Sequence, residues 1–187
     1  MSGGLRVGAR VRPLILRAGA ALAAGLAGCG GSSPPAGTLN GTAVAALGPR
    51  ETLITKPMVS AQVPPQWHAT TRLPGAAVVL EGPGGQMCTV TGTGYRGYHS
   101  VGAEMHSLRV GVARIHGASI LRTFTVQGRD GTSGRGVVLH VPGLNTREAL
   151  LHHGRAAAGV DCQAPPARFA ASEGRFEAFL ASVEVAP

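Results

Sequence analysis

The sequence is poor in the residues and motifs that identify most DNA-binding, membrane-spanning and catalytic proteins. Its 187 residues include one tryptophan, two tyrosines, four phenylalanines and nine acids. Lys56 is the single lysine, and the arginines are scattered without interleaved aromatic side chains, which excludes nucleic acid as a partner. The apolar stretch at residues 14–28 is interrupted by Arg17 and is shorter than the roughly 20 residues that span a membrane.

The signatures of hydrolytic enzymes are also missing. The nucleophile elbow Gly-x-Ser-x-Gly does not occur, and Ser133 lies in a Gly-Thr-Ser-Gly sequence that is typical of a turn. The acids form no obvious pair of a general acid and a general base. A catalytic cysteine would need a free thiol at Cys88 or Cys162, for which we predict another role below. We therefore expect no enzymatic activity and no catalytic residue.

The first 28 residues have the three parts of a secretory signal peptide. Residues 1–17 contain four arginines and no acid, residues 18–27 are uncharged, and Gly28 is a small residue at the cleavage point. No two arginines are adjacent, which favours the general export route over the twin-arginine route. The run Leu26-Ala27-Gly28-Cys29 resembles the lipobox of bacterial lipoproteins.

This resemblance implies that residues 1–28 are removed and that Cys29 becomes a lipidated N-terminus. Residues 29–42 then form a flexible tether, and residues 43–187 form a single α+β domain. The partner is a membrane, contacted through the lipid, and we expect an exported lipoprotein of the bacterial cell envelope. Gly30 in place of Asp is compatible with the outer membrane, if the organism has one. The alternative is a disordered N-terminus that is never exported.

The other two cysteines form an even pair once Cys29 carries lipid. In an oxidising compartment we predict a disulfide between Cys88 and Cys162, which would stabilise the domain by about 4 kcal/mol in the chain-entropy model. The alternative is two buried free thiols. Metal binding by this pair is not expected, because neither cysteine lies in a Cys-x-x-Cys or Cys-x-x-His spacing.

Strands are predicted over most of the chain between Leu39 and Arg168, because apolar and polar residues alternate with a period of two. The segments with this character are 58–63, 76–81, 86–93, 108–113, 120–126 and 136–141. The sequence Gly128-Arg129-Asp130-Gly131 predicts the hairpin turn between the last two, because its glycines tolerate positive φ.

Two helices are predicted after these strands. The capping box Asn145-Thr146-Arg147-Glu148 indicates one that runs to about Ala158. The second begins near Ser172 with one apolar face, and residues 183–185 return as a short strand. Strands followed by helices favour an α+β fold, with an antiparallel β-sheet flanked by C-terminal helices and one disulfide.

Two short motifs resemble the PsbP-like domains found in many bacterial lipoproteins. Val63-Pro64-Pro65-Gln66-Trp67 is similar to their opening of a strand followed by Pro-x-x-Trp, and residues 176–183, FEAFLASV, are similar to their C-terminal helix. The resemblance implies an antiparallel sheet flanked by helices. Because members of that family act mostly as accessory or binding proteins, it implies no catalytic residue.

No cofactor and no metal are expected. Residues 92–97 match Gly-x-Gly-x-x-Gly, but the residues that follow make a poor helix and no acid lies about 20 residues on, so we interpret them as a glycine-rich loop. The histidines do not have a ligand spacing, although scattered histidines leave a zinc or copper site open; they are His68, His99, His106, His116, His140, His152 and His153.

Trp67 has two interpretations, a core anchor after the Pro-Pro turn and an exposed aromatic ring at a binding edge. Three functions follow, of which we expect the first: an accessory or binding role in an envelope protein complex. A hydrophobic edge of the sheet would favour it. A small-ligand carrier, periplasmic or extracellular, would need a deep apolar pocket lined by Trp67 or Phe124. A hydrolase without a recognisable motif would need clustered His and acid side chains in a cleft.

Overall fold

The structure is a computed structural model that describes residues 46–73, 77–93 and 101–186. By its internal contacts the chain divides after Pro35, and all described residues belong to the second unit. The predicted signal peptide, the lipobox with Cys29 and the tether at residues 29–42 lie outside the described residues. So do His99 and most of the glycine-rich motif.

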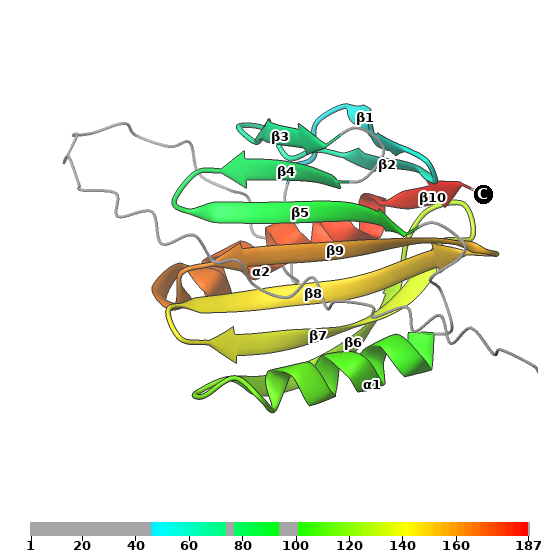
Figure 1. Ribbon diagram of the computed structural model, residues 1–187. Coiled ribbons are helices and arrows are strands. Elements are labelled where there is room, and N and C mark those ends of the chain that lie inside the picture. Colours follow the sequence, from blue (N-terminus) through cyan, green and yellow to red (C-terminus); the bar gives the residue numbers. More distant parts are fainter. Residues whose placement is uncertain (1–45, 74–76, 94–100, 187) are drawn as a thin grey trace, which may run out of the picture. The chain divides into compact units, whose positions relative to one another are not determined.

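Two antiparallel sheets form the framework of this unit (Figure 1). The larger has seven strands, which in spatial order are β3 (His68–Leu73), β4 (Ala77–Gly82), β5 (Gln86–Thr93), β9 (Ala156–Ala164), β8 (Leu144–His153), β7 (Ser133–Val141) and β6 (Ser119–Gln127). The smaller has three, in the order β1 (Arg50–Thr55), β2 (Met58–Gln62) and β10 (Glu184–Ala186). Short turns join most consecutive strands, as antiparallel pairing allows.

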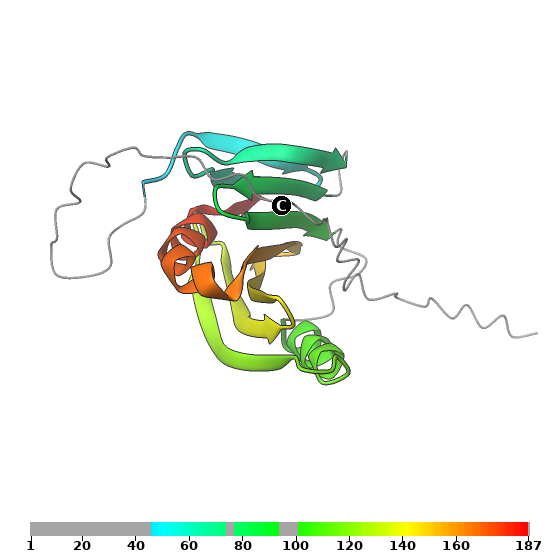
Figure 2. The same cartoon turned by 90° about the vertical axis from the view of Figure 1, so that its left-hand side faces the viewer.

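The two helices lie on opposite faces of the seven-stranded sheet (Figures 1 and 2). Helix α2 (Pro166–Ser182) buries Phe169, Phe176, Phe179 and Leu180 against β8, β9 and β2. Helix α1 (Val101–Val112) covers only β6 and β7 on the other face, where Val112 packs near Val137 and Leu139. The main hydrophobic core therefore lies on the α2 side, and on the opposite face the described part of the chain places a helix over β6 and β7.

The predicted α+β class is confirmed, with mostly antiparallel sheets and a C-terminal helix. Strands occur at five of the six predicted segments, and the chain returns after α2 as the predicted short strand, β10. The hairpin turn between β6 and β7 is also confirmed, since Asp130 and Gly131 both have positive φ there. Helix α2 begins at Pro166, six residues before the predicted start.

The predicted helix over residues 145–158 is wrong. These residues form most of strand β8, a turn at Gly154 and the first three residues of β9. Arg147, Ala149 and Leu151 alternate toward α2, and β8 has hydrogen-bonded neighbours on both sides. Pairing on two edges and burial on one face outweigh the helix propensity of alanine and leucine and the capping-box pattern.

The predicted strand over residues 108–113 is wrong as well. It lies in and just after α1, whose buried contacts come from Met105, Leu108 and Val112 at helical spacing. Val110, which the alternation placed beside Leu108 on one strand face, is 38% exposed on this helix. A narrow apolar stripe on a helix can imitate a period of two over six residues.

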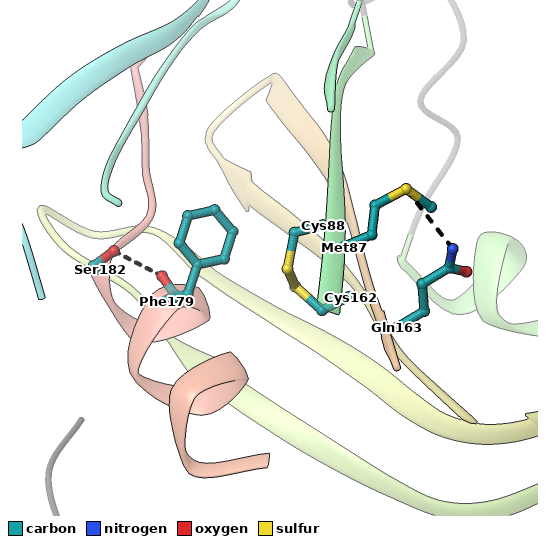
Figure 3. The surroundings of a disulfide bond; sticks show 6 residues. All are labelled: Met87, Cys88, Cys162, Gln163, Phe179 and Ser182. Atoms are coloured by element: carbon teal, nitrogen blue, oxygen red, sulfur yellow. Dashed lines mark hydrogen bonds between the residues drawn. A yellow bond between two sulfur atoms is a disulfide. The ribbon is translucent and has the colours of Figure 1, made fainter. Parts of the chain in front are cut away.

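The disulfide between Cys88 and Cys162 is confirmed and joins the central strands β5 and β9 (Figure 3). The two residues lie directly opposite each other in register, and neither is exposed. Their sulfur atoms project toward Phe179 on α2, whereas Met87 and Gln163 point to the other face. There Gln163 Nε2 donates a hydrogen bond of 3.9 Å to Met87 Sδ. Within the described ranges, no helix is both long and apolar enough to cross a membrane.

Candidate functional site

The face of the seven-stranded sheet that points away from α2 is rich in polar side chains, and we call it the polar face. Residues that are opposite in register share a face, so its members follow from the strand pairing. It carries Thr89 and Thr91 on β5, Asp161 and Gln163 on β9, Glu148 and His152 on β8, Ser133 and Arg135 on β7, and Thr125 and Gln127 on β6. Among the described residues, α1 is the helix that packs on this face, against β6 and β7.

An acid pair lies at the centre of the polar face. Glu148 on β8 is directly opposite Asp161 on β9, and Thr89 on β5 is opposite Asp161 on the other side. Side chains in such cross-strand positions have Cβ atoms about 5 Å apart. Both residues keep some exposed surface, but Asp161 Oδ1 is buried and no hydrogen-bond donor in the described part of the chain reaches it.

Burial and mutual repulsion favour the protonated forms of these two carboxyl groups. Desolvation, together with the charge of Asp161, raises the pKa of Glu148 from 4.5 to about 7. Desolvation raises the pKa of Asp161 from 3.8 to about 6. Two facing carboxyl groups with raised pKa values retain a proton near neutral pH, so the pair both donates and accepts hydrogen bonds there.

A shallow, largely open pocket lies on the same face, near the acid pair. Its volume is about 430 Å³, and it is lined by Gly102 in the first turn of α1 and by Thr125, Gln127, Ser133, Gly134, Arg135 and His152. Arg135 and Leu150 are partners in register, one step from the row that holds Glu148. The acid pair does not line this pocket, and every side chain that does is polar or cationic, apart from the two glycines.

The opposite face carries a charged network that fastens β8 to α2. Arg147 is 6% exposed, and its guanidinium lies 2.9 Å from Glu177 and 3.6 Å from Glu173. The same guanidinium stacks 4.0 Å from the centre of the Phe124 ring, and Arg122 on β6 also pairs with Glu173. Desolvation lowers the pKa of Arg147, while Glu177 acts against that shift. We assign this network to packing of the helix, because its charges are already paired with one another.

Trp67 lies in the core, with only 7% of its surface exposed. Its ring packs against Phe176 and Phe179 of α2 at centroid distances of 6.1 and 5.9 Å. Gly82 makes room for the indole, since a Cβ there would lie 2.2 Å from Nε1. This is the core-anchor interpretation; the exposed ring that the binding interpretation required is not what the structure has. Phe124 does not line the described pocket either.

The glycine-rich motif and the histidines form neither a Rossmann unit nor a three-ligand metal site in the described part of the chain. Helix α1 does begin soon after the glycine-rich motif, contrary to our expectation of a poor helix. However, every strand pairing of the described sheets is antiparallel, so a Rossmann unit with adjacent parallel strands is not formed there. His152 and His153 point to opposite faces of β8, and His153 Nδ1 lies 3.1 Å from the Val185 carbonyl oxygen. Among the described residues, no three potential metal ligands come together.

The acid pair is the feature that the sequence-based search did not find. Its two members are 13 positions apart, and the capping-box pattern predicts a helix N-terminus at Glu148. The signal that identifies it is the alternation of Glu148, Leu150 and His152 with Arg147, Ala149 and Leu151. If these residues form a strand, the pattern places Glu148 on the face opposite Arg147. A hairpin centred on Gly154 then places Asp161 opposite Glu148.

Comparison with known proteins supports the fold. No family model matches the sequence, and no curated protein matches it significantly. The solution structure of cyanobacterial PsbP (CyanoP) from Synechocystis sp. PCC 6803 is similar, with a TM-score of 0.53 and 13% identity, over 82% of this chain and 100% of that chain. The chain has a PsbP-like fold at low identity. At this identity the likeness supports the fold alone.

Two other solved structures are less similar. A protein of unknown function from Pseudomonas aeruginosa gives a TM-score of 0.49 and 12% identity, over 68% of this chain and 92% of that chain. The Saccharomyces cerevisiae Ran-binding protein Mog1p gives 0.48 and 11%, over 75% of this chain and 96% of that chain. Neither carries an argument about function.

Proposed function

We propose that this chain is a membrane-anchored lipoprotein of the cell envelope that acts by binding, as an accessory subunit, and not by catalysis. The observation that carries the proposal is the use of the three cysteines. Two of them are joined in the core, which leaves Cys29 alone in its lipobox-like sequence. A buried disulfide fits an oxidising compartment outside the cytoplasm, and a single remaining cysteine after an apolar segment fits lipidation.

The accessory role is supported by the fold and by one edge of the sheet. The PsbP-like resemblance implies a family of mostly accessory or binding proteins. Strand β6 forms one edge of the seven-stranded sheet, and its Leu121 is 55% exposed. An apolar side chain on a sheet edge is a common docking point for a partner that adds a strand.

The anchor is tested by Cys29→Ser, with Ser33→Ala as the matched control in the same segment. We expect the wild type and Ser33→Ala to sediment with membranes and to incorporate labelled fatty acid. Cys29→Ser should lose the label and appear in the soluble fraction. A Cys29→Ser protein that remains membrane-bound and lipid-labelled would defeat the anchor.

The accessory role is tested separately, by photo-crosslinking in cells. A photoreactive amino acid replaces Leu121, or, as the control, Met58, which is 48% exposed on β2. We expect one envelope protein to crosslink at position 121 and not at position 58, and only when Cys29 is present. Crosslinks of equal yield at both positions would indicate random collisions and contradict the role.

A second function, carriage of a small ligand, is favoured by the pocket of about 430 Å³ on the polar face. Its lining is polar, which differs from the apolar pocket around Trp67 or Phe124 that we expected for a carrier. The ligand would therefore be polar.

A further inference from the structure

The pocket beside α1 has a chemical character that selects among polar ligands. Its lining combines the guanidinium of Arg135 and the ring of His152 with the hydroxyl groups of Ser133 and Thr125 and the amide of Gln127. Among the described residues, none of the seven that line it is acidic. Cationic and hydroxyl donors without a competing carboxylate are the usual surroundings of a bound phosphate group.

Arg135 is placed to act as the charged group of this pocket. It is exposed at its place on β7, and it takes part in none of the ion pairs found in the described part of the chain. Arg50, Arg72, Arg122 and Arg147, in contrast, each face a glutamate. The guanidinium of Arg135 therefore has its donors available for a planar, two-point contact with phosphate oxygens.

The pocket also includes Gly102, in the first turn of a helix of 12 residues. The first N–H groups of a helix have no partner within the helix, and the helix dipole makes that end partly positive. The partial positive charge of the helix end adds to the charge of Arg135, which is the main positive group of the pocket. A volume of about 430 Å³ lies at the lower end of the range for small-molecule sites.

We propose that this pocket binds the phosphate group of a small phosphomonoester, with Arg135 as the principal contact and Ser133 and Thr125 as hydroxyl donors. The inference rests on the second proposed function, ligand carriage, and gives its ligand class. It is independent of lipidation, so it can fail while the anchor holds, or hold while the anchor fails. A free phosphomonoester and a phospholipid headgroup present the same group, and the experiment separates them.

The first arm titrates glycerol 3-phosphate into the full-length protein by calorimetry. We compare the wild type with Arg135→Gln and with the control Arg114→Gln. Arg114 is exposed and lies just beyond the C-terminal end of α1, so its substitution removes the same charge outside the pocket. We expect saturable binding by the wild type, weakened about tenfold or more by Arg135→Gln and changed less than about twofold by Arg114→Gln. Ser133→Ala should weaken binding by about threefold.

The second arm measures flotation with vesicles of phosphatidic acid in phosphatidylcholine, against phosphatidylcholine alone. It uses Cys29→Ser protein, so that the lipid anchor does not contribute. If Arg135-dependent binding occurs only with glycerol 3-phosphate, the ligand is a soluble phosphomonoester. If Arg135-dependent binding occurs with the phosphatidic acid vesicles, the ligand is a phospholipid headgroup. No saturable binding in either arm, or equal loss with Arg135→Gln and Arg114→Gln, overturns the proposal. Thermal unfolding of each variant confirms that it is folded.

Discussion

Glu148 and Asp161 lie opposite each other on β8 and β9, so that two carboxyl groups share one position on the polar face. Like charges in directly opposed positions destabilise a sheet. The structure therefore favours a state in which at least one of the two is protonated, as their pKa values of about 7 and about 6 indicate. The pair makes the stability of the fold sensitive to pH.

The sign of this effect follows from the two shifts. An acid whose pKa is higher in the folded than in the unfolded protein binds more protons when folded, so its stabilising contribution is present at low pH. We expect the contribution of the pair to the free energy of unfolding to fall as pH rises from about 4 to about 7, by roughly 5 kcal/mol. Urea denaturation at a series of pH values measures it.

Two variants separate the pair from other acids in that titration. Glu148→Gln removes the group with the higher pKa and should flatten the pH dependence between about 4.5 and about 7. Glu51→Gln is the control, since that side chain is 45% exposed in an ion pair with Arg72. The interpretation fails if Glu51→Gln flattens the curve as much as Glu148→Gln does.

The disulfide gives a second prediction. Cys88 and Cys162 are 74 positions apart, so opening the bond frees a long loop in the unfolded chain and should cost about 4 kcal/mol. Cys88→Ser and Cys162→Ser should lower the free energy of unfolding alike, because each removes the same bond from a fully buried site. Denaturation of both variants and of the reduced wild type checks this. Clearly unequal losses, or free thiols at Cys88 and Cys162 in the protein isolated from cells, would count against it.

The charged network between β8 and α2 gives a third prediction. Arg147 is buried, touches two glutamates and stacks on Phe124, so Arg147→Ala should cost about 3 kcal/mol. Arg122→Ala removes a guanidinium that is 50% exposed beside the same Glu173 and should cost less than about 1 kcal/mol. Chemical denaturation of the two variants measures the loss in the free energy of unfolding. Equal losses would mean that the burial of Arg147 contributes nothing to stability.

Much of the fold follows from local sequence, since most strands alternate cleanly and one turn is encoded by glycine. Both errors exchanged a helix and a strand where local pattern and long-range pairing disagree. Residues 145–158 have good helix formers, yet β8 and β9 are held by neighbours and by α2, which no local window reveals. Helix α1 packs through only a narrow stripe, which leaves a weak period in its sequence.

The candidate site was less accessible to sequence reasoning, because it is made by register. The disulfide could be predicted from the cysteine count together with the predicted oxidising compartment. Glu148 faces Asp161, and Arg135 joins the same sheet face, only when β7, β8 and β9 are aligned, and a shift of one residue would turn each to the other face. For Trp67 the sequence allows two interpretations, a core anchor and an exposed binding residue. They differ only in the exposure of the ring, which the sequence does not give.

Strand β10 completes the three-stranded sheet by pairing with β2, so Val185 lies beside Val59 although 126 positions separate them. Strand β10 is the last of the described elements in chain order, so this sheet cannot be completed before α2 has been synthesised. Until β10 pairs, β2 lacks one of its two neighbours. The three-stranded sheet thus depends on a contact between distant parts of the chain, and such contacts form slowly during folding.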